Sequence, residues 1–90
     1  MAIVQFTSNL KRFYPNLNSK LTQAGTIAEL VEELNQTFPG IRNYITDDQK
    51  RLRHHVNVFI NDSMIEDRIT LTDKIGADDH VYIMQALSGG

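Results

Sequence analysis

Apolar and polar residues alternate along several short stretches of this chain, and that alternation is typical of β-strands with one buried face. In the first stretch, Val4 and Phe6 point to one side, while Ile3, Gln5 and Thr7 point to the other. The second stretch is short and mostly polar, which suits a strand at the edge of a sheet. Four strands are predicted in this way: 3–7, 19–23, 56–60 and 81–87. A further short strand is expected between the last two of them, just beyond a turn at Asn61-Asp62.

The middle of the N-terminal half has a helical repeat instead. Thr26 can accept a hydrogen bond in the first turn while Glu29, three residues later, reaches back, as in a capping box. Pro39-Gly40 ends the helix, and a short helical turn is expected at 41–45. The apolar residues recur at offsets of three and four and form one stripe, which we interpret as core: Ile27, Leu30, Val31, Leu34 and Phe38.

Turn-forming residues separate these elements. The connections are a hairpin loop at 11–16, a loop at 46–50, a tight turn at Asn61-Asp62, a packed connection at 71–75 and a turn at 76–79. The basic pair Lys11-Arg12 lies in the first loop. It is either a contact for an acidic partner or an ordinary solvated pair.

The order of elements predicts an α+β fold, because a single amphipathic helix can cover one face of one sheet. The first and last strands have the clearest apolar alternation, so we expect them at the centre of an open mixed sheet with the main helix across one face. This arrangement is the β-grasp, or ubiquitin-like, architecture. We expect one β-grasp domain over residues 1–87 and a flexible tail at 88–90.

Composition restricts the class of function. Ninety residues, 41% of them hydrophobic and 22% charged, are typical of one small globular domain. The lack of cysteine excludes a disulfide scaffold, a zinc ribbon and a thiol nucleophile. A net charge of −2 gives no basic footprint for nucleic acid, and no run approaches the roughly 18 apolar residues of a membrane span. We therefore expect a cytoplasmic domain that binds neither nucleic acid nor membrane.

The interior of the sequence offers no convincing active site. It has no glycine-rich phosphate loop, no nucleophile elbow and no His-Glu-x-x-His pair. His54 and His55 would point to opposite faces of a strand, and His80 is distant, so we expect no metal site. Asp47-Asp48 and Asp78-Asp79 lie in turn-like contexts, where aspartate is a common turn former.

The end of the sequence is more informative. Gly89-Gly90 follows directly after an apolar strand. Glycine has no Cβ, so such a pair can lie extended in a channel too narrow for other residues. The terminus carries a free α-carboxylate, which is a poor electrophile until it is activated. We interpret Gly90 as a reactive end delivered into another protein's active site; the alternative is an ordinary frayed terminus.

A second candidate site is the sheet face away from the helix. If Val58 and Ile83 face the helix, alternation places Phe59, Tyr82 and Met84 on the opposite face. Exposed apolar patches often mark partner surfaces. We expect a docking patch made of Phe59, Tyr82, Met84, Met64 and Leu87, unless a neighbouring loop covers it.

Several segments together resemble the MoaD/ThiS family of ubiquitin-like sulfur carriers. They are Thr26–Leu30, Val56–Asp62, Asp78–Met84 and the final Gly89-Gly90. Within that family, Leu52–Asp62 and the long first hairpin through Pro15 are similar to CysO-type carriers, which serve cysteine synthesis. The chain departs from the family where it has Gln85-Ala86 in place of a frequent proline, which leaves the partner of the tail open.

The resemblance implies a cycle of activation and transfer. An E1-like adenylating and sulfur-transfer enzyme would activate the Gly90 carboxylate with ATP, with AMP bound transiently, and sulfur would replace AMP to give a thiocarboxylate. Gly89 would provide clearance. The acceptor of the CysO-type cycle is a pyridoxal phosphate (PLP)-dependent cysteine synthase, and a JAMM-type metalloprotease would release the product. The resemblance implies a carrier rather than an enzyme, with no bound cofactor and no metal.

Three other functions remain open from the sequence. One is the small subunit of molybdopterin synthase, held in a larger catalytic subunit. Another is a protein modifier in the manner of ubiquitin, joined to lysines through the same carboxylate. The third is a plain β-grasp interaction module. A longer precursor trimmed to expose Gly90 is compatible with each reading of the tail.

Overall fold

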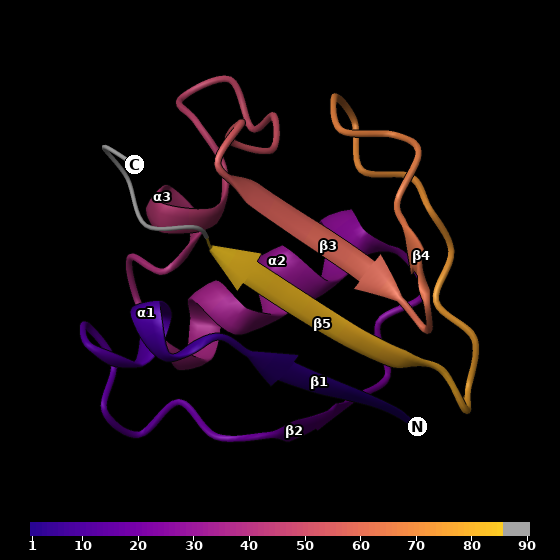
Figure 1. Cartoon of the computed structure of the whole chain (residues 1–90), viewed down its shortest axis with the longest axis horizontal. Helices are drawn as coiled ribbons and strands as arrows, with labels where there is room; N and C mark the ends of the chain where they lie inside the picture. The colour runs from indigo at the N-terminus through magenta and orange to yellow at the C-terminus, as the bar shows by residue number, and fades with distance from the viewer. Residues whose placement is uncertain (86–90) are drawn as a thin grey trace.

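A computed structural model describes residues 1–85 of the chain. Leu87, Gly89 and Gly90, and with them the predicted tail at 88–90, lie outside the described residues. The described elements, in chain order, are β1 (Ala2–Phe6), α1 (Ser8–Lys11), β2 (Lys20–Thr22), α2 (Ile27–Thr37), α3 (Arg42–Ile45), β3 (Val56–Ile60), β4 (Ser63–Met64) and β5 (His80–Gln85) (Figure 1).

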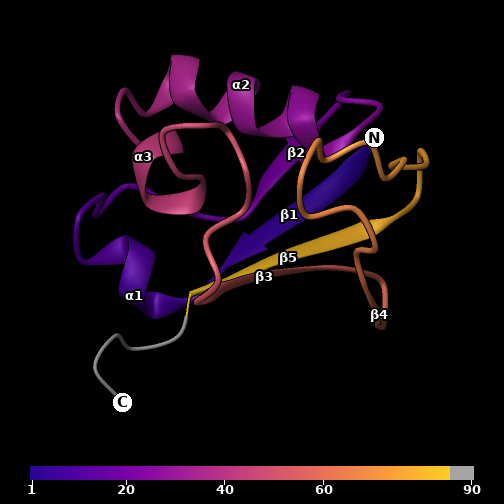
Figure 2. The ribbon, with the colours of Figure 1, turned by 90° about the horizontal axis from the view of Figure 1, so that it is seen from above.

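The strands form one five-stranded sheet in the order β2-β1-β5-β3-β4. β1 and β5 run parallel and the other neighbours run antiparallel, so the sheet is mixed. The main helix α2 lies across one face of this sheet, with α3 on the same side (Figure 2). The predicted α+β architecture and the internal positions of the first and last strands are therefore confirmed.

The core lies between α2 and the sheet. Val4 pairs with Val81 and Phe6 pairs with Ile83, so the buried residues of β1 and β5 form continuous rows. Most of the predicted helical stripe is buried against these rows; Phe38 lies at the helix end, half-buried, with its ring edge-on to Tyr14. The apolar pattern of the sequence therefore marks the inner faces correctly.

Replacing the fully buried Leu30 with alanine is expected to destabilise the fold by about 2–5 kcal/mol, because it removes buried methyl groups and leaves a cavity beneath α2. Urea unfolding followed by circular dichroism would measure the change. Gln36→Ala, at an exposed position of the same helix, is the matched control, with an expected change within about 0.5 kcal/mol. If Leu30→Ala and Gln36→Ala lost equal amounts of unfolding free energy, the assignment of Leu30 to the buried face of α2 would be contradicted.

The start of α2 follows the predicted capping motif with one difference. The Thr26 side chain accepts a hydrogen bond from the Glu29 N–H at 3.2 Å. The Glu29 carboxylate, however, accepts from the Gly25 N–H at 3.4 Å rather than from Thr26. The carboxylate thus holds the residue before the cap, which fixes the direction in which the chain enters the helix.

The prediction of a simple loop at 11–16 was wrong at its start. The chain forms the one-turn helix α1, with Lys11 as its last residue, before the turn around Pro15. Leu10 is the physical reason, because a helical turn carries its side chain into the core, where it is fully buried. Leu17 is buried in the same way as the chain returns towards β2.

Asp67 organises the long connection between β4 and β5. Its carboxylate accepts hydrogen bonds from the backbone N–H groups and hydroxyls of Thr70 and Thr72, and from the Ile69 N–H. The hydroxyl of Thr70 and then that of Thr72, with their backbone N–H groups, hold the pKa of Asp67 far below its usual range. The ionised carboxylate is therefore part of the folded structure of this connection.

The lowered pKa of Asp67 predicts a pH dependence. A carboxylate whose pKa is lower in the folded state than its unfolded value of about 4 stabilises the protein above that pH, and the contribution is lost as the pH falls towards the folded-state pKa. Asp67→Asn is expected to lower the free energy of unfolding at neutral pH. In acid, the difference in free energy of unfolding between the variant and the wild type should become smaller. Urea unfolding at several pH values would measure it. Asp48→Asn, at an exposed loop position, is the control, and a constant Asp67→Asn difference at every pH would contradict the prediction.

Candidate functional site

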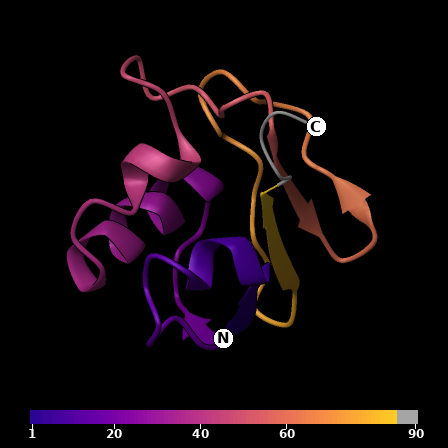
Figure 3. The ribbon, with the colours of Figure 1, turned by 60° about the vertical axis from the view of Figure 1, so that its left-hand side comes forward.

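Figure 3 shows α2 and α3 on one side of the sheet. We call the opposite side the open face; it carries the described residues of the predicted docking patch, Phe59, Met64, Tyr82 and Met84. Phe59 lies opposite Tyr82 on β5 and opposite Met64 on β4, so the three side chains form one row across three strands. Met84 lies opposite Asn57, one step along the same face. The predicted proximity of the two strands is confirmed, whereas a docking role for these residues stays a prediction.

The patch is less exposed than the sequence suggested. Phe59, Tyr82 and Met84 are half-buried, and Met64 is 49% exposed. Large side chains directly opposite each other on neighbouring strands shield one another, which explains the intermediate exposure. Leu87, the fifth member of the predicted patch, lies outside the described residues.

The open face continues further than predicted. Ile3 is 43% exposed and Leu21 is 60% exposed, and the two lie opposite each other on β1 and β2. The signal was present in the sequence, because the alternation of β1 already placed Ile3 opposite to Val4. Leu21 was missed because a single apolar residue in a polar strand has no clear period.

A polar strip separates the two apolar parts of the open face. The Gln5 side-chain oxygen lies 2.8 Å from His80 Nε2. A shallow hollow of ≈550 Å³ beside this pair is lined by Gln5, Asn61, Asp62, His80 and Tyr82. The open face therefore offers apolar contact at both sides and hydrogen-bonding groups between them, as partner surfaces commonly do.

The point at which the chain leaves the sheet is anchored from both sides. Gln85 pairs with Val56 of β3 on one side. On the other side, the Thr7 hydroxyl accepts from the Gln85 N–H at 3.2 Å, and the Asn9 side-chain amide donates to the Gln85 carbonyl at 2.9 Å. We call these contacts of Thr7, Asn9 and Val56 the exit clamp. It fixes the position of Gln85, the last residue that the structure describes.

The histidine pair lies at the end of a strand. His54 and His55 occupy the turn directly before β3, and their rings meet edge-on with centroids 5.6 Å apart. His80 lies at the other end of the sheet, at the start of β5. Across residues 1–85, no three side chains of histidine or acidic type come together as metal ligands.

One aspartate of each predicted pair, Asp47 or Asp79, has a structural role in a turn. Asp79 accepts from the Asn61 side-chain amide at 3.0 Å and from the Gly76 N–H at 2.6 Å, and these two bonds lower its pKa. Asp47 accepts from the Arg51 N–H and the Gln49 N–H, which also lower its pKa. Both carboxylates are thus kept ionised by turn contacts.

In the described part of the chain, no helix is long and apolar enough to cross a membrane.

This arrangement of sheet, covering helix and anchored chain exit defines a ubiquitin-like protein of the β-grasp class. The profile of the ThiS family matches residues 4–90, and the chain belongs to that family. No curated protein sequence matches it closely enough to count as a relative.

Solved structures similar to this chain show the same fold at low sequence identity. A chain of the Amycolatopsis orientalis BexX/CysO complex has a TM-score of 0.83 at 19% identity, with 100% of both chains covered. CysO of Mycobacterium tuberculosis has a TM-score of 0.82 at 21% identity, with 97% of this chain and 100% of that one covered. SAMP1 of Haloferax volcanii has a TM-score of 0.75 at 18% identity, with coverage of 99% and 98%.

Proposed function

We propose that the protein is a sulfur carrier whose working form ends at Gly90 and carries sulfur there as a thiocarboxylate. Membership of the ThiS family over residues 4–90 is the observation that carries the proposal. The exit clamp supports it, because it holds Gln85, which precedes the last five residues of the chain, firmly against the folded body. The body then works as a handle and the carboxyl group of Gly90 as the reacting group.

The proposed chemistry has two steps. First, a Gly90 carboxylate oxygen attacks the α-phosphorus of ATP, pyrophosphate leaves, and an acyl adenylate forms. Second, a hydrosulfide equivalent supplied by the activating enzyme attacks the carbonyl carbon, the C–O bond to AMP breaks, and AMP leaves with the bonding electrons. The product is a thiocarboxylate, which is a good sulfur nucleophile. In this cycle the carrier is a substrate of other enzymes rather than a catalyst.

The proposed partners follow from this chemistry. An E1-like enzyme would adenylate the tail and transfer sulfur in the cytoplasm, where ATP is available. A biosynthetic enzyme would accept the sulfur, and the fold likeness to CysO supports a PLP-dependent cysteine synthase or an enzyme of related sulfur metabolism. A JAMM-type metalloprotease would then release the sulfur-containing product from the carrier. The open face around Phe59, Tyr82 and Met84 is the proposed docking surface.

A second candidate function is protein modification. Two similar structures carry the name small archaeal modifier protein, which supports this alternative at the level of fold. A modifier would use the same activated Gly90 to form isopeptide bonds with lysines. Detection of adducts on many unrelated proteins in an extract would favour the modifier over sulfur transfer to a small molecule.

Intact-mass analysis tests the proposed function. The protein ending at Gly90 is incubated with ATP, a sulfur donor and an extract of the host. We expect an oxygen-to-sulfur mass increase confined to the C-terminal peptide and dependent on ATP. No increase in an extract shown to load another carrier of this family would reject the proposal.

A further inference from the structure

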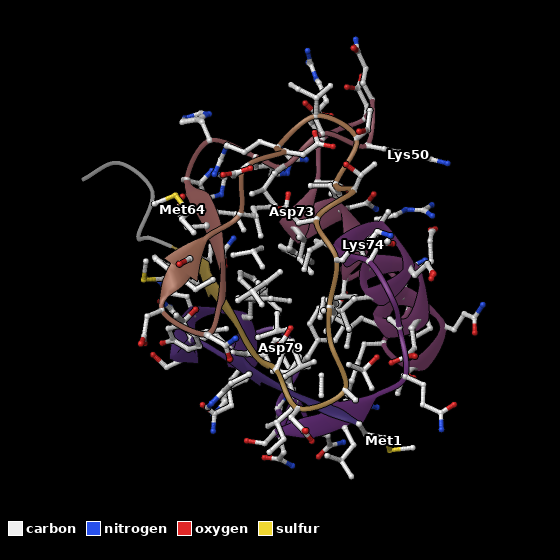
Figure 4. The ribbon with its side chains drawn as sticks, turned by 90° about the vertical axis from the view of Figure 1, so that its right-hand side faces the viewer. Met1, Lys50, Met64, Asp73, Lys74 and Asp79 are labelled. Carbon is white, nitrogen blue, oxygen red and sulfur yellow. The ribbon has the colours of Figure 1, made fainter. Side chains whose placement is uncertain are left out.

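The two ends of the β3–β5 pair differ in charge. At one end, β5 begins beside the β3–β4 turn, and this end carries the carboxylates of Asp62, Asp78 and Asp79. At the other end, β5 finishes at Gln85 between α1 and the segment 46–55 (Figure 2). In the view of Figure 4, Lys50, in that segment, lies apart from Asp79, with Lys74 between them. Cations therefore predominate at the Gln85 end of β5, although Asp47 and Asp48 also lie there, and carboxylates predominate at the other end.

On one side of the chain exit, α1 presents two exposed cations. Lys11 is its last residue and Arg12 follows it. Asn9, two residues before Lys11, donates the side-chain hydrogen bond to the Gln85 carbonyl. Both cations therefore lie within about one helical turn of the exit clamp. This is the basic pair whose role the sequence left open.

On the other side, the segment before β3 forms a basic hollow of ≈380 Å³. Its polar lining consists of Asp47, Arg51, Arg53, His54, His55 and Arg68. Asp47 is the only carboxylate of that lining, and it pairs with Arg51 at 3.1 Å.

The other two arginines of the hollow are held in place by neutral acceptors. Arg53 donates to the Asn43 carbonyl, and Arg68 donates to the Asn57 side chain and to the carbonyls of Arg53 and Val56. These bonds fix both guanidinium groups without neutralising their charge. Val56 is also the residue that pairs with Gln85, so Arg68 lies close to the chain exit.

We propose that this basic end, made of Lys11, Arg12, Arg51, Arg53, His54, His55 and Arg68, is a docking surface for an acidic protein. Its occupant is the carboxylate-lined entrance of the enzyme site that accepts residues 86–90. The inference rests on the proposed function and adds to it the chemistry of the partner and the orientation of approach.

The charge arrangement supports an acidic partner in particular. The net charge of the whole chain is −2, so the molecule as a whole does not attract anions. The local field does, because the cations on both sides of Gln85 outnumber the nearby carboxylates of Asp47 and Asp48, whereas Asp62, Asp78 and Asp79 lie at the far end. An acidic entrance attracts the basic end and repels the far end, which turns the carrier tail first during encounter. Complementary charge of this kind acts mainly on the association rate.

A binding experiment that needs no sulfur chemistry tests the surface directly. The full chain, labelled with ¹⁵N, is titrated with a hexaglutamate peptide and, separately, with inorganic phosphate. We expect peptide-dependent amide shifts at residues 9–13 and 51–56, and none around Asp62 and Asp78. Shifts spread over the whole surface would overturn the proposal. The proposal would also be overturned if inorganic phosphate, at the same concentration as the peptide, caused equal amide shifts at these residues. That result would indicate a site for small anions instead.

A kinetic experiment tests the surface in the proposed cycle. Lys11→Gln combined with Arg12→Gln removes two positive charges at the exposed turn, and Lys74→Glu lowers the net charge equally at an exposed position outside the basic end (Figure 4). At low salt, we expect the double variant to lose about tenfold in kcat/KM for sulfur loading with kcat unchanged, and Lys74→Glu to lose little. The difference in kcat/KM between the double variant and Lys74→Glu should become smaller as the salt concentration is raised.

The outcomes separate the two proposals. If the wild type is never loaded but the peptide shifts are confined to the basic end, the proposed function fails and the docking surface stands. If the wild type is loaded and the double variant and Lys74→Glu lose equal activity, the proposed function stands and the docking surface fails.

Discussion

A single alanine added after Gly90 is expected to abolish sulfur loading, with a loss of at least about a thousandfold in the rate of thiocarboxylate formation. The added residue moves the reacting carboxylate one residue further along the chain, which displaces it by about 3.5 Å. It also places a Cβ where the proposed channel accepts only glycine. Intact-mass analysis of the wild type and the extended chain in the same reaction would measure the effect.

The control for this prediction is an alanine inserted between Ala2 and the exposed Met1, where β1 begins beside the start of β5 and thus at the opposite end of that strand from Gln85. Both chains have one more residue, and both should unfold at nearly the wild-type urea midpoint. Only the chain extended after Gly90 should lose sulfur loading. Normal loading of the extended chain would show that the terminal carboxylate is not the reacting group.

Met84→Asp is expected to weaken activation by about 30-fold or more in kcat/KM, which corresponds to a binding hot spot of about 2 kcal/mol. Met84 lies on the open face opposite Asn57, on the strand that leads to the chain exit. A carboxylate there would be desolvated against a partner's apolar surface without a counter-charge. The loading rate as a function of carrier concentration would measure the change.

Leu21→Asp is the matched control for Met84→Asp. It also places a carboxylate on the open face, but on the edge strand β2 and further from the chain exit. We expect little change in loading for Leu21→Asp and a near-normal urea midpoint for both variants. A Met84→Asp protein that fails to fold would contradict the assignment of Met84 to the open face. An equal loss of loading in both variants would show that the partner covers the whole face.

The elements that could be predicted from the sequence are those with a long, regular apolar period. The stripe from Ile27 to Leu34 and the alternation in β1, β3 and β5 determined the helix, the strands and their inner faces. The adjacency of Phe59 and Tyr82 followed from the fold that these patterns predicted. Local patterns are sufficient there because burial of one face fixes both the period and the register.

The features that could not be predicted depend on contacts between distant residues. The exit clamp joins Asn9 to Gln85, 76 residues apart, and requires β1 and β5 to be parallel neighbours. Arg68 joins a loop to the start of β3 through backbone carbonyls, which no pattern of side chains encodes. The short helix α1 was missed because one turn is too short to show a period.

The position of β5 between β1 and β3 has a consequence for biosynthesis. A nascent chain on the ribosome that has not yet released residues 80–85 lacks the strand that joins the two halves of the sheet, together with the buried Val81 and Ile83. Its first four strands and helix α2 therefore lack a complete core. Folding must therefore wait until residues 80–85 have left the ribosome, so a chain that lacks them cannot become a folded substrate for other enzymes.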